Sequence, residues 1–206
     1  MKKNLFPGRL VVIEGLDGSG KSTQIKLLGQ KLAPRGVDFY LTREHTRDGP
    51  AGKLIERVVS SQEKLNPIAL QLLFVVDRLD HLEREVEPEL VKGKLVLCDR
   101  YYWTTVAYGS QVADREWFIE ANRYCLEPDL VIYLEVSPQE AIRRTKVRGE
   151  KATIFEEISK INKFSQSYQW LLSRFSDQSV KINGERQPEV IVEDIIGILE
   201  KRGLIS

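Results

Sequence analysis

Short apolar runs alternate with longer amphipathic stretches along this chain of 206 residues. Residues 10–13, 95–98 and 130–134 are apolar throughout, and residues 37–42 and 180–182 are shorter β-rich runs. A continuously apolar run, rather than an alternating one, is typical of a strand covered on both faces. The pattern therefore predicts a three-layer α/β protein, with roughly five parallel strands in one sheet and helices on both of its faces.

Helical periodicity fills the intervals between these runs. Apolar residues recur at spacings of three and four over residues 25–32 and 67–89. Residues 138–148 and 188–201 have a similar pattern, each with a proline near its start, where a helix tolerates it. No repeat or linker-like stretch interrupts the series, and the length favours a single domain over residues 1–206. No run approaches the ~18 apolar residues of a membrane span, so we expect no membrane association.

A glycine-rich loop follows the first predicted strand and opens a predicted helix. It reads Gly15-Leu16-Asp17-Gly18-Ser19-Gly20-Lys21-Ser22 and matches the phosphate-binding pattern G-x-x-x-x-G-K-[ST]. Glycines let the backbone curl so that its N–H groups point at a phosphate, and the N-terminus of the helix adds a favourable field. Lys21 supplies a charge for the β- and γ-phosphates, and Ser22 a hydroxyl for Mg²⁺. The loop predicts that the chain binds a nucleoside triphosphate.

A carboxylate at the tip of a neighbouring strand usually completes such a magnesium site. Two candidates follow predicted strands, Asp99 and Glu135. Asp99 is favoured because Arg100 follows it directly, so that a carboxylate and a guanidinium leave one strand end together. That end lies at the carboxyl edge of the sheet, where ligands bind in open α/β folds. The other interpretation of this pair is a structural salt bridge at the strand end.

Composition and charge limit the partners and the catalytic groups that the sequence can offer. A net charge of +1 indicates no basic surface, so nucleic acid is not an expected partner. Cys98 and Cys125 form no metal or redox motif, and we expect reduced, buried thiols in a cytoplasmic protein. The only two histidines, His45 and His81, belong to no recognisable nucleophile–base motif.

Transfer of a phosphoryl group to a phosphate monoester needs no such base. The second pKa of a monoester is about 6, so at neutral pH most of the acceptor is already a dianionic nucleophile. Repulsion between two polyanions then calls for cations and Mg²⁺. The candidate cations of this sequence are Arg43, Arg47, Arg78, Arg100, Arg143, Arg144, Arg148 and Lys151. Each of them, taken singly, is also explained as a solvated surface charge.

Three segments of the chain together carry a resemblance to a known family. The first is residues 12–24, with an acidic residue inside the phosphate loop. The second is Asp99-Arg100-Tyr101, followed by Thr104, Ala107 and Tyr108, and the third is residues 73–78. Their order and spacing resemble the thymidylate kinase family of nucleoside monophosphate kinases, for which the second segment is the most specific signal. The resemblance extends from Val12 to about Glu193.

The resemblance implies an enzyme that transfers a phosphoryl group from ATP, with Mg²⁺, to dTMP, giving ADP and dTDP. It also implies a P-loop fold with a mobile lid at about residues 144–156, and a homodimer formed through helices near residues 67–89. The donor would be bound by Gly15, Leu16, Asp17, Gly18, Ser19, Gly20, Lys21, Ser22 and Thr23. Ser22 and Asp99 would hold the metal. The acceptor would be bound by Asp17, Arg47, Phe74, Arg78, Arg100, Thr105 and Tyr108. The catalytic residues would be Lys21, Asp17, Arg100, Arg144 and Arg148.

The same resemblance implies a role for each part of the acceptor site. Phe74 would stack on the thymine, and Arg78 would donate to its O4. Without the resemblance, Phe74 is better explained as a core aromatic residue on an amphipathic helix. Arg100 would hold the acceptor phosphate in a bidentate fork. Tyr108 would crowd C2′ of the sugar, so that deoxyribose is preferred over ribose. Asp17 would accept a hydrogen bond from the 3′-hydroxyl and help to position Arg47 or the phosphate.

Four features depart from the family pattern. His45 stands where the family has proline, which leaves open whether Arg43 or Arg47 contacts phosphate. Gly109 stands where glutamine is common, and Gly18 stands where one branch of the family has arginine. The lid segment is less basic than usual. The charge of the transferred group would then be met by Arg144, Arg148 and Lys151.

Two other functions remain open from the sequence. A related kinase could act on another deoxynucleotide or on a deoxynucleoside. A P-loop switch that binds GTP would usually carry a guanine-reading N-K-x-D stretch after a later strand. The apolar run 130–134 ends instead in Glu135-Val136-Ser137-Pro138.

Overall fold

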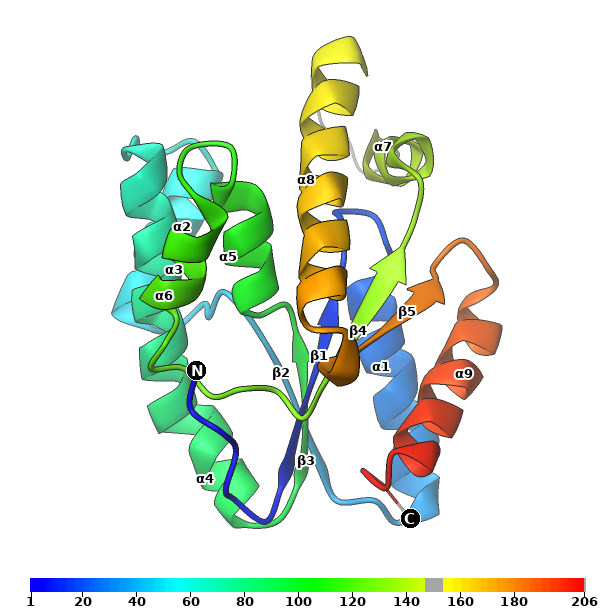
Figure 1. Cartoon of the computed structure of the whole chain (residues 1–206). Helices are drawn as coiled ribbons and strands as arrows, with labels where there is room; N and C mark the ends of the chain where they lie inside the picture. The colour runs from blue at the N-terminus through cyan, green and yellow to red at the C-terminus, as the bar shows by residue number, and fades with distance from the viewer. Residues whose placement is uncertain (147–153, 206) are drawn as a thin grey trace.

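Five parallel strands form one sheet in the order β2-β3-β1-β4-β5 (Figure 1). The computed structural model describes residues 1–146 and 154–205. The strands are β1 (Arg9–Glu14), β2 (Phe39–Arg43), β3 (Leu95–Asp99), β4 (Leu130–Glu135) and β5 (Ser179–Asn183). Four of the predicted runs lie within these strands, and the fifth, 37–42, overlaps β2, which begins two residues later than predicted. The predicted fold class is confirmed.

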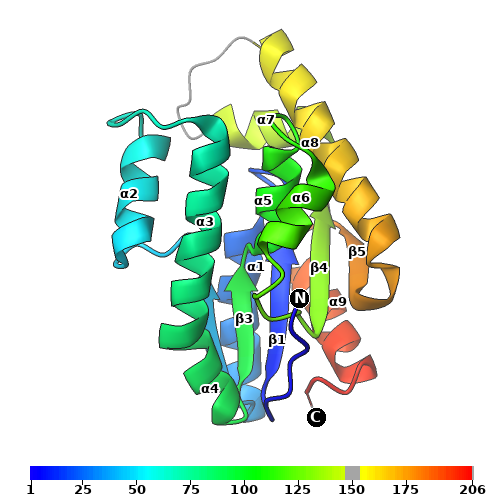
Figure 2. The same cartoon turned by 60° about the vertical axis from the view of Figure 1, so that its left-hand side comes forward.

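Side chains of β1 divide between two cores, one on each face of the sheet. Leu10 and Val12 belong to one buried cluster, and Val11 and Ile13 to the other. Helices α1 (Lys21–Leu32) and α9 (Pro188–Lys201) contribute side chains to the second cluster. Figures 1 and 2 show these two helices together on one side of the sheet. The first cluster is covered by residues of helices α4 (Glu87–Val91), α5 (Tyr102–Gly109), α6 (Arg115–Ala121) and α8 (Ile154–Arg174). Burial on both faces explains why these strands lack polar alternation.

Helix starts follow local chemistry. The Asn66 side chain accepts hydrogen bonds from the N–H groups of Ile68 and Ala69, and Pro67 fills the first position of α3 (Pro67–His81). The predicted helix over residues 67–89 is observed as three consecutive pieces, α3, the π-helical turn η2 (Leu82–Val86) and α4.

Several helices are present that the periodicity did not predict. They are α2 (Pro50–Val59), α5, α6 and α8, with short 3₁₀ turns at Ala33–Arg35 and Ser176–Gln178. Helix α7 (Pro138–Lys146) and α8 contain the two ends of the expected lid segment, 144–156. Arg148 and Lys151 of that segment lie outside the described residues. Among the described helices, none is long and apolar enough to cross a membrane.

The parallel sheet brings the chemistry of distant segments to one edge. Ile13 of β1 lies in register with Asp99 of β3, and Glu14 with Tyr133 of β4. The glycine-rich loop between β1 and α1 and the turn at Arg100 therefore leave the sheet side by side.

Gly109, one of the departures from the family pattern, ends α5 where α6 approaches it closely. A Cβ atom at this position would lie 2.5 Å from Cε2 of Phe118, whose ring is fully buried. The phenylalanine ring occupies the space that a longer side chain at position 109 would need.

We expect Gly109→Ala to lower the free energy of unfolding by about 1–3 kcal/mol, because a well-packed ring has to move. Gly197→Ala is the matched control, since no heavy atom lies within 4 Å of its Cβ position in α9. That variant should gain about 0.4–1 kcal/mol from reduced entropy of the unfolded chain. Chemical denaturation of both proteins measures the difference, and equal stabilisation of the two would contradict the close packing.

Candidate active site

The glycine-rich loop wraps around a cavity at the carboxyl edge of the sheet. Gly15 and Gly18 have φ values of 151° and 83°, which favour glycine. A Cβ at Gly15 would lie 2.8 Å from the Leu134 carbonyl oxygen, and one at Gly18 would lie 2.7 Å from that of Ala141. The cavity has a volume of about 250 Å³ and is lined by Asp17, Gly18, Gly20, Lys21, Ser22, Thr23, Arg43, Asp99 and Arg100. We call it the loop cavity.

Lys21 holds its ammonium group inside the loop. Its Nζ donates hydrogen bonds to the carbonyl oxygens of Gly15 and Leu16, at 3.0 and 2.8 Å. Burial and the nearby charge of Arg100 lower the pKa of Lys21 to about 8. A polyanion in the loop cavity would favour the charged form again.

Ser22 and Asp99 both line the same cavity. The Ser22 hydroxyl donates to Asp99 Oδ2 at 2.5 Å, whereas Asp99 Oδ1 is buried and has no partner among the described residues. Glu135, the other candidate carboxylate, instead forms an ion pair with Lys181 at 3.2 Å. Oxygen donors and an unpartnered carboxylate oxygen suit a hard divalent cation that keeps much of its water shell. Within the described residues, no cluster of three metal-ligating side chains is found.

Arg100 links the loop cavity to the rest of the site. Its φ of 73° is unusual for a non-glycine residue, and its N–H donates to the Ile13 carbonyl oxygen at 3.0 Å. The guanidinium donates to Asp17 and, at 3.3 Å, to the Thr104 hydroxyl. Burial opposes ionisation of Asp17, but the charges of Arg100 and Lys21 outweigh it and lower the pKa of that carboxyl. Asp17 also accepts a hydrogen bond from the Tyr108 hydroxyl at 2.9 Å.

A second cavity, of about 360 Å³, adjoins the loop cavity and shares three of its residues, Asp17, Arg43 and Arg100. We call it the acceptor cavity. Its remaining lining residues are Glu44, His45, Val59, Leu70, Gln71, Phe74, Arg78, Tyr101, Thr104, Thr105 and Tyr108. One end therefore carries two arginines, and the other carries aliphatic side chains and an aromatic ring.

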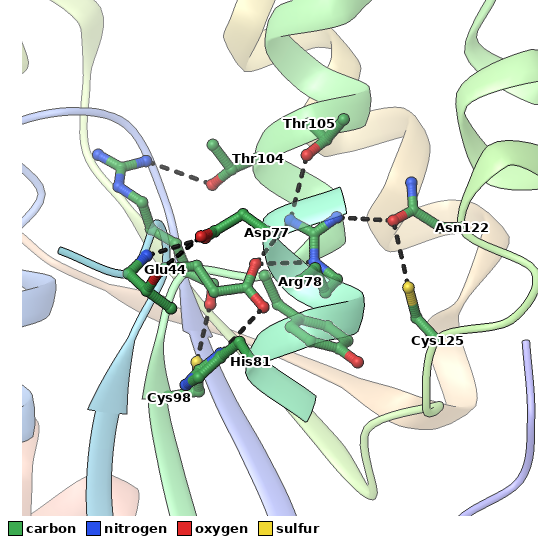
Figure 3. A network of polar contacts seen from close by, with 12 residues as sticks. Glu44, Asp77, Arg78, His81, Cys98, Thr104, Thr105, Asn122 and Cys125 are labelled. Carbon is green, nitrogen blue, oxygen red and sulfur yellow. Dashed lines mark hydrogen bonds and ion pairs between the residues drawn. The ribbon is translucent and has the colours of Figure 1, made fainter. Parts of the chain in front are cut away.

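Arg78 lies buried at the wall of the acceptor cavity, within a polar network (Figure 3). Its Nε donates to Glu44 at 2.7 Å and its Nη1 donates to Asn122 at 2.6 Å. Its Nη2 donates to the Thr105 hydroxyl at 3.2 Å. Burial disfavours the cation, but the charge of Glu44 outweighs it and raises the pKa of Arg78. The network fixes the plane of this guanidinium before any ligand binds.

Phe74 lies at the apolar end of the acceptor cavity and meets the His45 ring edge-on. The ring centroids are 5.7 Å apart, with 65° between the planes. His45 Nε2 is in turn within 2.9 Å of Glu56 Oε2 on α2. His45 therefore contributes a side wall of the cavity and a link to α2.

A third cavity, of about 500 Å³, adjoins the loop cavity on the side away from the acceptor cavity and shares Gly18, Gly20 and Thr23 with it. Arg144 lies at this third cavity, where its Nη1 donates to the carbonyl oxygens of Gly18 and Gly184, at 3.3 and 3.0 Å. Its Nε donates to Glu140 at 2.6 Å. This arginine holds the glycine-rich loop to the turn after β5.

Most residues expected at the site line one or more of these three adjoining cavities. Arg47 does not: it is exposed and lines none of the three, whereas Arg43 lines two of them. Leu16 contributes its carbonyl oxygen to Lys21, while its side chain lies in the core. Arg148 falls outside the described residues.

Three polar residues at the site were not predicted. Glu14 is fully buried and accepts hydrogen bonds from the N–H groups of Tyr101 and Thr104. Glu14 stands at the end of the first apolar run, directly before the glycine-rich loop, and this position could have identified it as a site residue from the sequence. Glu44 and Asn122 hold Arg78 from 34 and 44 residues away, and no local pattern points to them.

Comparison with known proteins gives consistent matches. The family model described as thymidylate kinase matches residues 13–195. The chain is 38% identical to a probable thymidylate kinase of Thermococcus onnurineus, over 92% of this chain and 96% of that protein. It is 36% identical to a probable thymidylate kinase of Pyrococcus horikoshii, over 94% and 96%. It is 38% identical to a thymidylate kinase of Desulfotalea psychrophila, over 77% and 79%.

The lowered pKa of Lys21 predicts a pH-dependent affinity for a triphosphate. In the free protein the ammonium loses its charge as the pH rises through about 8, and a bound triphosphate must restore it. We expect the Kd for ATP to rise by about tenfold per pH unit above that value, with uptake of one proton on binding. Calorimetry in two buffers of different ionisation enthalpy measures both quantities. Lys21→Arg keeps its charge throughout this range and should lack the dependence; the same slope in that variant would assign it to another group.

Proposed function

This chain belongs to the thymidylate kinase family, and from that premise we propose that it transfers the γ-phosphoryl group of ATP to the phosphate of dTMP, giving ADP and dTDP. The observation that carries the proposal is the set of three adjoining cavities, in which the loop cavity shares lining residues with each of the other two. The middle one holds the phosphate-binding loop, and it shares Asp17, Arg43 and Arg100 with the cavity that suits an acceptor nucleotide. Donor and acceptor phosphates would meet at this shared wall.

The donor triphosphate is proposed to lie in the loop cavity, with its nucleoside in the third cavity. Backbone N–H groups from Gly15 to Thr23, the start of α1 and Lys21 would neutralise its charge. Ser22 and Asp99 would hold Mg²⁺, since both residues line the loop cavity and Asp99 Oδ1 has no hydrogen-bond partner among the described residues. The ion, when bound, would offset negative charge on the phosphates. Arg144 would keep the loop in place through Gly18, and Arg148 would add charge from the lid.

The acceptor phosphate is proposed to bind at the end of the acceptor cavity that carries Arg100. Arg43 is a better second ligand than Arg47, because Arg43 lines both cavities at this point. A phosphate would compete with Asp17 for the Arg100 guanidinium and release that carboxylate toward the sugar. The acceptor oxygen is already anionic at neutral pH, so these arginines need only align it for in-line attack.

The pyrimidine is proposed to bind at the other end, between Phe74 and Arg78. Phe74 offers a ring face for stacking, and the guanidinium of Arg78 offers an N–H to a carbonyl oxygen such as O4 of thymine. The Thr105 hydroxyl, bonded to Arg78, lies beside it. Because Glu44 and Asn122 already orient Arg78, the base meets a preorganised donor.

The direct test is a panel of acceptors with ATP and the purified protein. We expect dTMP to be the preferred acceptor among nucleoside monophosphates and deoxynucleosides. Turnover of another deoxynucleotide or of a deoxynucleoside, with none of dTMP, would replace the substrate assignment. Slow ATP hydrolysis without stimulation by any acceptor would contradict kinase activity as such.

Phe74→Ala should raise the KM for dTMP about tenfold or more and leave the KM for ATP nearly unchanged, because stacking on one base contributes about 1–3 kcal/mol. Steady-state kinetics with each substrate varied in turn measures both constants. Tyr124→Ala is a suitable control, since this exposed aromatic residue lines none of the three cavities. Equal losses for both substrates would identify Phe74 as a core residue.

We also propose that the protein is a homodimer formed through α3. Leu72, Val76 and Leu79 lie on one face of this helix and are 37%, 54% and 39% exposed. Val75, Arg78 and His81 on the same helix are buried against the protein itself. An exposed apolar stripe opposite a buried face is typical of a second packing surface.

The cytoplasm is the proposed location of the protein, because both cysteines are free thiols and the proposed phosphoryl donor is ATP.

A charge in this stripe should disrupt the dimer. Val76→Glu is expected to convert the protein to a monomer in size-exclusion chromatography with light scattering, because an unpaired charge in an apolar interface is costly. Val190→Glu on α9 places the same charge at a valine of similar exposure, 47%, outside α3. A monomeric wild type, or a dimer that survives Val76→Glu, would exclude this interface.

A further inference from the structure

Three side-chain contacts join α5 and its C-cap residue Ser110 to α8, and two of them involve α5 residues that line the acceptor cavity, Thr104 and Tyr108. The rings of Tyr108 and Phe164 stack face to face, with centroids 4.2 Å apart and 16° between the planes. The hydroxyls of Ser110 and Ser167 are 2.8 Å apart. The third contact joins the Thr104 hydroxyl to the Tyr168 hydroxyl at 3.1 Å. The last two hold α8 in place independently of Phe164.

Tyr108 lies where the sugar of a bound nucleotide would be. On α5, Thr104 bonds Arg100 at the phosphate end of the acceptor cavity, and Thr105 bonds Arg78 at the base end. Tyr108 follows these residues by four and three positions, so it projects from the same face of the helix. A nucleotide that spans the two ends has its sugar between them, against this ring. In the protein without ligand, the Tyr108 hydroxyl donates a hydrogen bond to Asp17.

We propose that Phe164 determines the sugar specificity of the acceptor site, by holding the Tyr108 ring against C2′ so that 2′-deoxyribose is accepted and ribose is rejected. The inference rests on the proposed function. A parallel ring directly behind Tyr108 removes the space into which that ring would retreat. Protein interiors are close-packed, so a 2′-hydroxyl could enter only by displacing both rings. Phe164 is a positioning residue, because it acts through Tyr108 and does not line the cavity itself.

The test compares dTMP with ribothymidine 5′-monophosphate, which differs from it by one hydroxyl. Phe164→Ala opens space behind Tyr108, so kcat/KM for the ribonucleotide should rise relative to that for dTMP by about tenfold. A hydrophobic wall rejects an added hydroxyl by about a hundredfold, so this change is readily measured. The KM for ATP should not change. Phe164→Tyr keeps the ring and should keep the wild-type ratio.

Trp170→Ala is the matched control on α8. This aromatic ring packs against Arg115, with 4.7 Å between the guanidinium carbon and the ring centroid, and makes no stacking contact with Tyr108. The control should leave the specificity ratio unchanged. If Phe164→Ala does not fold, Phe164→Leu, which retains most of the volume without a flat ring, is measured in the same way.

The outcomes separate the inference from the proposed function. A wild-type protein that phosphorylates neither compound overturns the proposed function and this inference with it. A wild-type protein active on dTMP, with a ratio that stays constant in the Phe164 variants, overturns the inference alone. A fall in activity on both compounds in equal proportion also overturns the inference alone, since that is the behaviour of a structural residue. A selective gain for the ribonucleotide supports the assignment.

Discussion

Glu14 ends the central strand with its carboxylate fully buried, and the site is assembled around it. Its oxygen atoms accept hydrogen bonds from the backbone of Tyr101 and Thr104, from the Thr104 hydroxyl and from Tyr168 on α8. Burial raises the pKa of this carboxyl, while the bound donors and the charge of Arg100 oppose the rise. A buried carboxylate is costly unless its oxygens are satisfied. The turn after β3, the glycine-rich loop and α8 therefore have one favourable mutual arrangement, and the left-handed backbone of Arg100 belongs to it.

Three arginines of the candidate site are already paired with carboxylates of the protein itself. Arg100 lies against Asp17, Arg78 against Glu44 and Arg144 against Glu140. Each pairing keeps a guanidinium in a fixed plane without creating a basic surface, which agrees with a net charge of +1. In the proposed function, a ligand phosphate would replace the Asp17 carboxylate at Arg100, whereas at Arg78 the Glu44 carboxylate would stay and the base would use the remaining donor capacity. The exchangeable pairing at Arg100 suits a phosphate that takes part in the reaction. The permanent pairing at Arg78 suits recognition of a base of fixed shape.

The sequence predicted what is encoded locally and missed what long-range packing decides. The strands were evident because burial on both faces removes polar alternation, and the phosphate loop because its spacing is fixed by backbone geometry. Helix α8 was not predicted, although Ile158, Ile161, Phe164, Tyr168 and Leu171 recur at helical spacing. Helix α5 was hidden because its segment is nearly all apolar and aromatic, a composition typical also of a strand. The choice between Arg43 and Arg47 depended on the path of the chain after β2, which no spacing reveals.

The shared wall between the loop cavity and the acceptor cavity has a consequence for inhibition. Asp17, Arg43 and Arg100 line both cavities, so only these three side chains are common to the boundary between the two proposed binding regions. A single molecule with adenosine at one end, thymidine at the other and a chain of phosphates between them would follow the three cavities in order. Joining the two halves makes the second binding event intramolecular, with an effective concentration set by the linker. The number of phosphates that gives the tightest binding would then measure the distance between the adenosine site and the thymidine site.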